Sequence, residues 1–412
     1  MTSASFISRA TILSLPLLAC AKPPAAEDRA VRMDSAGVLI VENHRPQWSD
    51  SAGWLLSDEP IFQLGQADGD TLLEFNRIRR SVTLADGRIA IALGQQPQIR
   101  LFDRSGHFVT AFGRPGQGPG EFRSLNSIQR IDGDTIVALD TQGRRITAFA
   151  PDGSVAWLVD IRGGSGTPVA GPVRWGDGTL LVHREEASAL SRVASGSDRA
   201  GQTLRSRATL GRFDRSGAEL NIVIDAEGSE GSVFYVGGGP AMLPTPYGRN
   251  LSYALTSGTV LVGTQASYEI GEYDPTGKLL AVIRWPGPDL TVTPADIEKL
   301  KSELLDRARG KPDEIRGVED FFRDVAFPPA KAAYGRLLTD VDDYLWVSGA
   351  TVAATESPES WIVFDADREL LGAVRMPARF DLHEVGRDYV LGRWRDESGV
   401  EYIRMYSLSR AK

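Results

Sequence analysis

The chain has 412 residues, of which 42% are hydrophobic and 24% charged, so it can bury a large core and lacks the composition of a disordered polypeptide. It carries 46 basic and 54 acidic residues, a net charge of −8, which argues against binding to the phosphates of nucleic acids. The 43 glycines and 23 prolines recur at short intervals, a pattern typical of many short strands, and indicate a mostly β protein.

The first 19 residues resemble a bacterial lipoprotein signal peptide. Arg9 precedes an apolar run that ends in Leu17-Leu18-Ala19-Cys20, and small residues before a cysteine are typical of the lipobox. The resemblance implies a lipid on Cys20, a tether over residues 20–37, and a place in the cell envelope, periplasmic or facing the outer membrane. An ordinary cleaved leader and a buried free cysteine are the alternatives. With one cysteine, the chain can form no disulfide within itself.

Two neighbouring segments, residues 81–113 and 127–159, repeat the same pattern of four short strands separated by turns. Asp-Gly pairs supply the positive φ of tight hairpins, and branched side chains favour sheets. Two landmarks of this pattern recur along the chain. The first is a turn at residues 86–87, 132–133, 177–178, 257–258, 342–343 and 386–387, and the second an aromatic residue at Phe102, Phe149, Phe213, Tyr273, Phe364 and Tyr406. The chain therefore contains six such units.

Residues 113–122 read Gly-Arg-Pro-Gly-Gln-Gly-Pro-Gly-Glu-Phe, and residues 65–75 are a degenerate copy. This segment resembles the linker between blades of NHL repeats and of the related bacterial six-bladed β-propeller lipoproteins. The resemblance covers about residues 38–408. It implies an all-β, six-bladed β-propeller of four-stranded antiparallel blades over residues 38–412, and it says almost nothing about activity.

The ends of the chain are expected to close the ring. The sixth unit supplies three strands from Phe380 onward, and residues 60–65 precede the degenerate linker as residues 108–113 precede the good one. We therefore expect residues 60–65 to form the missing outer strand. Two apolar segments before it, residues 38–43 and 54–56, are expected to pack along the first or the last blade.

Two units depart from the regular pattern. In the third, a polar stretch rich in Ser and Arg over residues 188–206 indicates a loop. Between the fourth and fifth, Thr293-Pro294 opens a helix predicted over residues 294–309, whose apolar positions share one face. We expect this single inserted helix to pack against the outside or one end of the propeller; binding of a partner is the alternative.

The sequence contains little that indicates catalysis. His44, His107, His183 and His383 occupy different places in the repeat, so three of them cannot readily converge on one metal ion. Of three Asp-rich triplets, none has the full signature of a calcium loop and two stand at turns of the repeat. No Gly-x-Ser-x-Gly motif is present. We therefore expect no metal and no cofactor, and an enzyme is the less favoured prediction.

Propeller ligands usually lie at one mouth of the central channel, where loops from several blades converge. Candidate ligand-binding residues on such loops are Arg77, Arg80, Asp140, Arg144, His183, Arg184, Tyr268, Arg393, Trp394 and Arg395. Arginines with aromatic residues suit an anionic, sugar-like or peptide ligand, whereas the simpler interpretation is solvated loop ends held by salt bridges.

The sequence predicts a binding or scaffold module tethered to a membrane through its lipid alone. Its partner would be an unknown protein, peptide or carbohydrate and not a nucleic acid, and we expect a monomer. The alternative function is a hydrolase or lyase at the channel mouth that acts on a carbohydrate or small ester.

Overall fold

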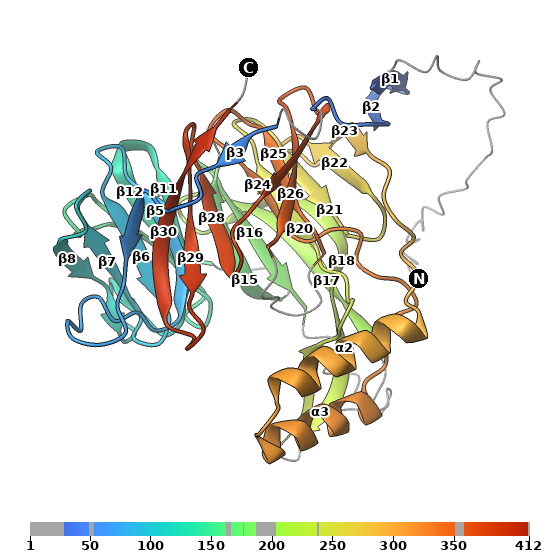
Figure 1. Ribbon diagram of the computed structural model, residues 1–412. Helices are drawn as coiled ribbons and strands as arrows, with labels where there is room; N and C mark the ends of the chain where they lie inside the picture. The colour runs from blue at the N-terminus through green and yellow to red at the C-terminus, as the bar shows by residue number, and fades with distance from the viewer. Residues whose placement is uncertain are drawn as a thin grey trace, which may run out of the picture.

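The computed structural model describes residues 29–48, 53–161, 166–175, 177–186, 203–236, 239–350 and 358–410. The expected signal peptide, Cys20 and residues 20–28 of the expected tether lie outside this range. Six sheets of four or more strands follow one another in chain order, and each is one blade (Figure 1). Within each blade, consecutive strands are antiparallel, and the prediction of a six-bladed β-propeller is confirmed.

Each blade is built around strands that are consecutive in the chain. Blade 1 contains β5 (Ile78–Thr83), β6 (Ile89–Leu93), β7 (Gln98–Phe102) and β8 (Phe108–Phe112), and blade 2 contains β11 (Leu125–Ile131), β12 (Thr135–Asp140), β13 (Arg145–Phe149) and β14 (Val155–Asp160). Blade 3 contains β15 (Thr167–Arg174), β16 (Leu180–Glu185), β17 (Thr203–Phe213), β18 (Glu219–Val236) and β19 (Gly239–Pro244). Blade 4 contains β20 (Ser252–Leu255), β21 (Val260–Gly263), β22 (Glu269–Tyr273) and β23 (Leu279–Arg284). Blade 5 contains β24 (Leu337–Thr339), β25 (Leu345–Ser348), β26 (Ser360–Phe364) and β27 (Leu370–Arg375), and blade 6 contains β28 (Phe380–Val385), β29 (Tyr389–Arg395) and β30 (Glu401–Ser409).

First strands of neighbouring blades lie next to each other at four of the seams. β5 contacts both β11 and β28, β11 contacts β15, and β20 contacts β24. The first strands therefore surround the axis of the propeller. A short parallel pair, β9 (Arg114–Pro115) and β10 (Glu121–Phe122), lies in the glycine-rich linker between blades 1 and 2.

Glycine turns join the strands within blades. In the turn between β5 and β6, the Gly87 N–H donates to the Leu84 carbonyl at 2.9 Å, and Gly87 has φ of +84°. The Asp86 carboxylate accepts from the Arg88 N–H at 3.0 Å. This Asp-Gly pair reverses the chain tightly because glycine adopts positive φ without steric cost.

Blade 6 is completed by the N-terminal part of the chain. β4 (Phe62–Leu64) pairs antiparallel with β30, with Leu64 opposite Ile403 and Phe62 opposite Met405. β3 (Leu55–Leu56) pairs with the far end of the same strand. The Leu64 side chain is buried in a cluster that also contains Phe75, Leu391 and Ile403. Residues 62–64 thus take the place expected for the missing outer strand.

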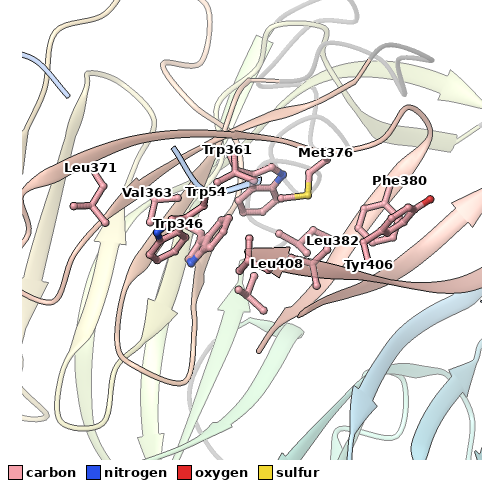
Figure 2. Close-up of a cluster of buried hydrophobic side chains, with 13 residues drawn as sticks. Trp54, Trp346, Trp361, Val363, Leu371, Met376, Phe380, Leu382, Tyr406 and Leu408 are labelled. Carbon is pink, nitrogen blue, oxygen red and sulfur yellow. The ribbon is translucent and has the colours of Figure 1, made fainter. Parts of the chain in front are cut away.

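Trp54 fixes this N-terminal segment against blades 5 and 6. Its ring lies 5.7 Å from that of Trp346 and 5.6 Å from that of Tyr344, and the Arg410 guanidinium lies over it at 4.4 Å. Figure 2 shows Trp54 beside Trp346 and Trp361, in a cluster that continues to Phe380 and Tyr406 of blade 6. Of the two places expected for residues 54–56, the first or the last blade, the structure has the last.

The expectation for residues 38–43 is wrong. β2 (Val38–Asn43) pairs in parallel with β23, the outer strand of blade 4, and β1 (Ala30–Ser35) adds a further antiparallel strand. The Asn43 amide donates to the carbonyls of Arg284 and Arg368 and accepts from the Leu370 N–H, so it joins blades 4 and 5. An apolar strand satisfies its backbone on any open sheet edge, and its composition does not name the edge. β1 therefore lies within the segment that was expected to be a tether.

An inserted unit, which we call the arm, consists of residues 203–207, 227–236, 239–244 and 291–330. It contains α2 (Pro294–Arg307), capped as expected by Thr293, whose hydroxyl accepts from the Asp296 N–H at 3.2 Å. A second helix, α3 (Pro312–Asp324), was not expected, so the prediction of one inserted helix is corrected to two. Gly310, with φ of +82°, turns the chain between the two helices.

The arm is tied together by hydroxyl groups. Those of Thr203, Ser232 and Thr245 all donate to the Ala326 carbonyl, at 3.0, 3.2 and 3.0 Å. Figure 1 shows α2 and α3 projecting from one end of the propeller. Of the loop expected over residues 188–206, residues 188–202 lie outside the described part, and residues 203–206 belong to β17. No helix among the described residues is long and apolar enough to span a bilayer.

Replacing Leu64 by alanine should lower the free energy of unfolding by about 2–5 kcal/mol, because it removes a buried side chain from the closing strand. Ile61 in the same segment is 60% exposed, so Ile61→Ala should change it by less than about 0.5 kcal/mol. Urea unfolding followed by tryptophan fluorescence measures both variants. Equal losses would contradict the closing role of this strand.

Candidate functional site

Charged residues from three blades and a tyrosine from a fourth stand at one end of the propeller. Arg80 and Asp381 stand near the starts of β5 and β28, Tyr253 near the start of β20, and Arg336 directly precedes β24. The first strands of all blades begin at this end and the second strands finish there, since the strands within a blade are antiparallel. We call it the arginine face. Figure 1 shows β29 pointing toward the same end of the molecule as the arm.

Asp381 is held by two arginines. Arg336 Nη2 lies 2.7 Å from its Oδ1, and Arg393 Nη2 lies 2.8 Å from its Oδ2. Burial alone would raise the pKa of Asp381, but the interactions with His383, Arg336 and Arg393 outweigh it and hold this pKa well below its ordinary value. Asp381 therefore stays ionised and already has its partners.

Glu401 is the second carboxylate of this region and is also fully engaged. It accepts from the Ile78 N–H at 2.6 Å, from Arg393 at 3.3 Å and from Arg395 at 2.9 Å. Its side chain is 9% exposed. The acidic groups at the seam between blades 1 and 6 are thus saturated with hydrogen bonds.

Three arginines beside these carboxylates are in a different position. Arg77, Arg79 and Arg80 form no side-chain hydrogen bond or ion pair with any described residue, and the Nε of Arg79 is buried. Burial lowers the pKa of Arg79, and the charges of Arg77 and Arg393 lower it further. Positive charge is therefore in excess here.

Arg80 stands within β5, the first strand of blade 1. Burial, and next the charge of Arg336, lower its pKa to about 10, while Glu384, Asp381 and Tyr253 oppose this shift. These groups belong to blades 4, 5 and 6, whereas Arg80 belongs to blade 1. The strand that carries Arg80, β5, contacts the first strands of both neighbouring blades, and part of the Arg80 surface is accessible.

His383 lies against the first strand of blade 1. Its Nδ1 accepts from the Ser81 N–H at 3.0 Å and lies 2.9 Å from Ser81 Oγ, so the neutral ring carries its proton on Nε2. Nε2 is buried, without a hydrogen bond, 3.6 Å from Asp381 Oδ2. Burial lowers the pKa of His383 to about 4, although Asp381 opposes this.

Ser81, His383 and Asp381 stand in the order of a nucleophile, base and acid. Ser81 is 0% exposed, however, so a substrate cannot reach its Oγ. The row of side chains is therefore a packing contact between blades 1 and 6 and not a hydrolytic triad. Among the described residues, no group of His, Cys, Asp and Glu has the arrangement of a metal site.

The structure brings four of the ten sequence candidates together at the arginine face: Arg77, Arg80, Arg393 and Arg395. His183 lies near them, since its ring centroid is 5.6 Å from that of Tyr253, in a T-shaped contact. It is 6% exposed, and burial lowers its pKa.

The other five candidates make contacts within or between blades. Asp140 is fully buried and accepts from the N–H groups of Arg123, Ser124 and Gly143. The remaining contacts are those of Arg144 with the Gly166 carbonyl, Arg184 with Glu219, Tyr268 with the Pro288 carbonyl and Trp394 with the Ala378 carbonyl.

Four residues of the site were missed by the sequence reasoning: Tyr253, Arg336, Asp381 and Glu401. The first three stand at or near the start of a first strand, as Arg80 does. Comparing the six first strands position by position was the signal that could have found these three.

Residues 73–155 match a protein-family model described as a 6-bladed beta-propeller. A member of the DUF4221 family from Bacteroides vulgatus is similar in structure, with a TM-score of 0.50 and 12% identity over 88% of this chain and 100% of that chain. A proposed exported protein from Bacteroides fragilis has a TM-score of 0.48 and 14% identity, over 90% of this chain and 100% of that chain.

Virginiamycin B lyase from Staphylococcus aureus, in a catalytically inactive form with quinupristin, gives a TM-score of 0.43 and 10% identity, over 86% of this chain and 99% of that chain. No curated protein matches the sequence. At these identities the likeness concerns the fold alone. What this chain is similar to is thus a six-bladed propeller, and the similarity names no reaction.

Asp140→Ala should lower the free energy of unfolding by about 3 kcal/mol or more, because it leaves three buried N–H groups without an acceptor. Asp68→Ala, at an exposed position, is the control and should stay within about 0.5 kcal/mol. Chemical denaturation measures both changes. A stable Asp140→Ala variant would show that the carboxylate serves something other than its loop.

His383 should make stability depend on pH. The ordinary pKa is 6.5 and the folded value about 4, so between these values the unfolded chain binds a proton that the folded protein excludes. The contribution is complete above about pH 6.5 and is lost as the pH falls toward 4, by roughly 3 kcal/mol. His383→Gln should remove most of this slope.

The measurement is the urea midpoint at several pH values between about 7 and 4.5. His107→Gln removes an imidazole from an exposed turn and serves as the control, which should keep the wild-type slope. If His383→Gln also keeps it, another group titrates in this range.

Proposed function

We propose that this protein is an exported, lipid-anchored propeller that binds a ligand with acidic groups at the arginine face. The supporting observation is that Arg77, Arg79 and Arg80 have no hydrogen-bonding partner among the described residues, while Asp381 and Glu401 beside them are saturated. An anion that accepts hydrogen bonds from an arginine also reduces the repulsion between that arginine and neighbouring cations. A carboxylate-, sulfate- or phosphate-bearing ligand supplies that anion.

Binding is favoured over a hydrolase or lyase reaction, because the serine that contacts His383, Ser81, is buried. Ser81 is inaccessible and His383 is 1% exposed. The arginines of this face are hydrogen-bond donors that carry positive charge. Such groups hold and orient an anion, and none of them is a nucleophile.

The lipid anchor would set the orientation of this face. Residues 21–29 span at most about 30 Å when extended, and the described chain then enters β1. Figure 1 shows β1 and β2 at the upper right, far from α2 and α3 at the bottom. A membrane at the end of this short tether would lie near the β1 and β2 hairpin, and the arginine face would point away from it.

Replacing Arg77 and Arg79 together by glutamine should weaken binding of acidic chains by roughly tenfold or more, since hydrogen bonds to charged groups are lost. The probes are a fluorescent hexaglutamate peptide and a fluorescent oligogalacturonate, followed by anisotropy. Wild-type binding should decrease with added salt.

The matched control is Arg316→Gln, an exposed arginine of α3 that is not one of the residues of the arginine face. It should bind both probes as the wild type does. Failure of both probes to bind the wild type, or an equal loss in the control, would overturn the proposal. Preference for one probe identifies the ligand as a peptide or a carbohydrate.

A further inference from the structure

We propose a second binding site, for one residue of a neutral sugar, in a cavity at the end of the propeller opposite the arginine face. The cavity has a volume of about 450 Å³ and is lined by Ala85, residues 129–134 and Trp175. This volume lies within the range of about 300–1,000 Å³ that is typical of small-molecule sites. The site is separate from the arginine face and goes beyond the proposed function.

The wall of the cavity comes from three neighbouring blades. Ala85 follows β5 of blade 1, residues 129–134 form the end of β11 and the next turn of blade 2, and Trp175 follows β15 of blade 3. β11 contacts both β5 and β15. Trp175 is 2% exposed and packs among residues of blades 3 and 4. The cavity therefore lies where three adjacent first strands end.

The turn of blade 2 that lines the cavity is held in place by Asp134. Its Oδ1 accepts from the Ala85 N–H at 2.8 Å, which joins blades 1 and 2. Gly133 and Asp134 both have positive φ, of +67° and +58°. A Cβ atom at Gly133 would meet nothing within 4 Å, so the space beside the turn is open. The polar groups of this turn are thus fixed before a ligand arrives.

A donor and an acceptor stand side by side in this wall with unused capacity. Arg130 Nη1 lies 3.8 Å from Asp134 Oδ1, a distance too long for a hydrogen bond. The Arg130 guanidinium donates to no described residue, and Asp134 Oδ2 accepts from none. The Arg130 side chain is 38% exposed and that of Asp134 17%. Both groups can therefore take a ligand as their partner.

This pair of groups favours neighbouring hydroxyl groups. A hydroxyl both donates and accepts, so two adjacent hydroxyls of one sugar ring can donate to Asp134 Oδ2 and accept from Arg130. An anionic ligand fits less well, because the carboxylates of Asp132 and Asp134 both line the cavity. A cationic ligand would be repelled by Arg130. A neutral ring with several hydroxyls meets neither penalty.

The test is titration of the purified protein with the methyl glycosides of glucose, galactose and mannose, followed by saturation-transfer NMR. We expect saturable binding of at least one of them. Asp134→Asn should weaken it roughly tenfold or more. Asparagine keeps an Oδ1 acceptor for the Ala85 N–H and tolerates positive φ, so the change acts on Oδ2 alone. Arg130→Gln should weaken binding to a similar degree.

Ala85→Trp tests the place of the site without removing a polar group. Ala85 is exposed and lines the cavity, so a large side chain there fills the space while the backbone N–H is kept. This variant should abolish binding of the glycoside. The matched control is Asp86→Asn, at the neighbouring exposed position that does not line the cavity, and it should bind as the wild type does.

Absence of saturable binding by all three glycosides would overturn the proposal, and so would an equal loss in Asp86→Asn. Tighter binding of the corresponding glucuronide or of glucosamine, with the same dependence on Asp134, would show that the site takes a charged ligand. The double variant with Arg77→Gln and Arg79→Gln should bind the glycosides normally; a loss there would move the site to the arginine face. The acidic probes test that face separately, so either proposal can fail alone. Circular dichroism and melting temperatures separate lost binding from lost folding.

Discussion

Gln63 and Arg404, 341 residues apart in the chain, meet through a hydrogen bond in the last blade. The pairing of β4 with β30 around them is the constraint on which the rest of the propeller depends. Without it, β30 has an open edge, and the packing of Leu64 with Leu391 and Ile403 is lost. Since each blade buries its faces against two neighbours, an open seam between blades 6 and 1 exposes apolar surface on both sides.

The same seam creates the unusual electrostatics of the arginine face. Closure brings the start of β5, with its arginines, against β28 and β29, which carry Asp381 and Arg393. The carboxylates there take up Arg336, Arg393 and Arg395, and the guanidinium groups of β5 stay without partners among the described residues. Repulsion between like charges lowers the stability of the folded protein. Such an arrangement is therefore typical of sites that serve a function, such as the binding of an anion.

How far the sequence determined these conclusions differs from element to element. The blades, the closing strand and the start of α2 follow from local signals: Asp-Gly turns, alternating branched residues and the Thr293-Pro294 cap. The place of β2 does not, because its parallel partner β23 is distant in sequence and any open edge satisfies an apolar strand. For the site, loop position predicted Arg80 and Arg393. It gave Asp140 the same weight, since position in a repeat does not reveal that a carboxylate turns inward to accept three backbone N–H groups.

The helical segment of the arm, residues 291–330, is inserted through a narrow neck. Thr291 and Ala330 form an isolated antiparallel bridge, and the Val292 N–H donates to the Pro329 carbonyl at 3.0 Å, so the segment that contains both helices leaves and re-enters blades 4 and 5 at one point. A chain whose two ends are already adjacent can be exchanged for another compact sequence with little loop-closure cost. This neck is thus a suitable site for domain insertion. A fluorescent reporter or a foreign recognition module could replace the helical segment there without changing the order of the blades.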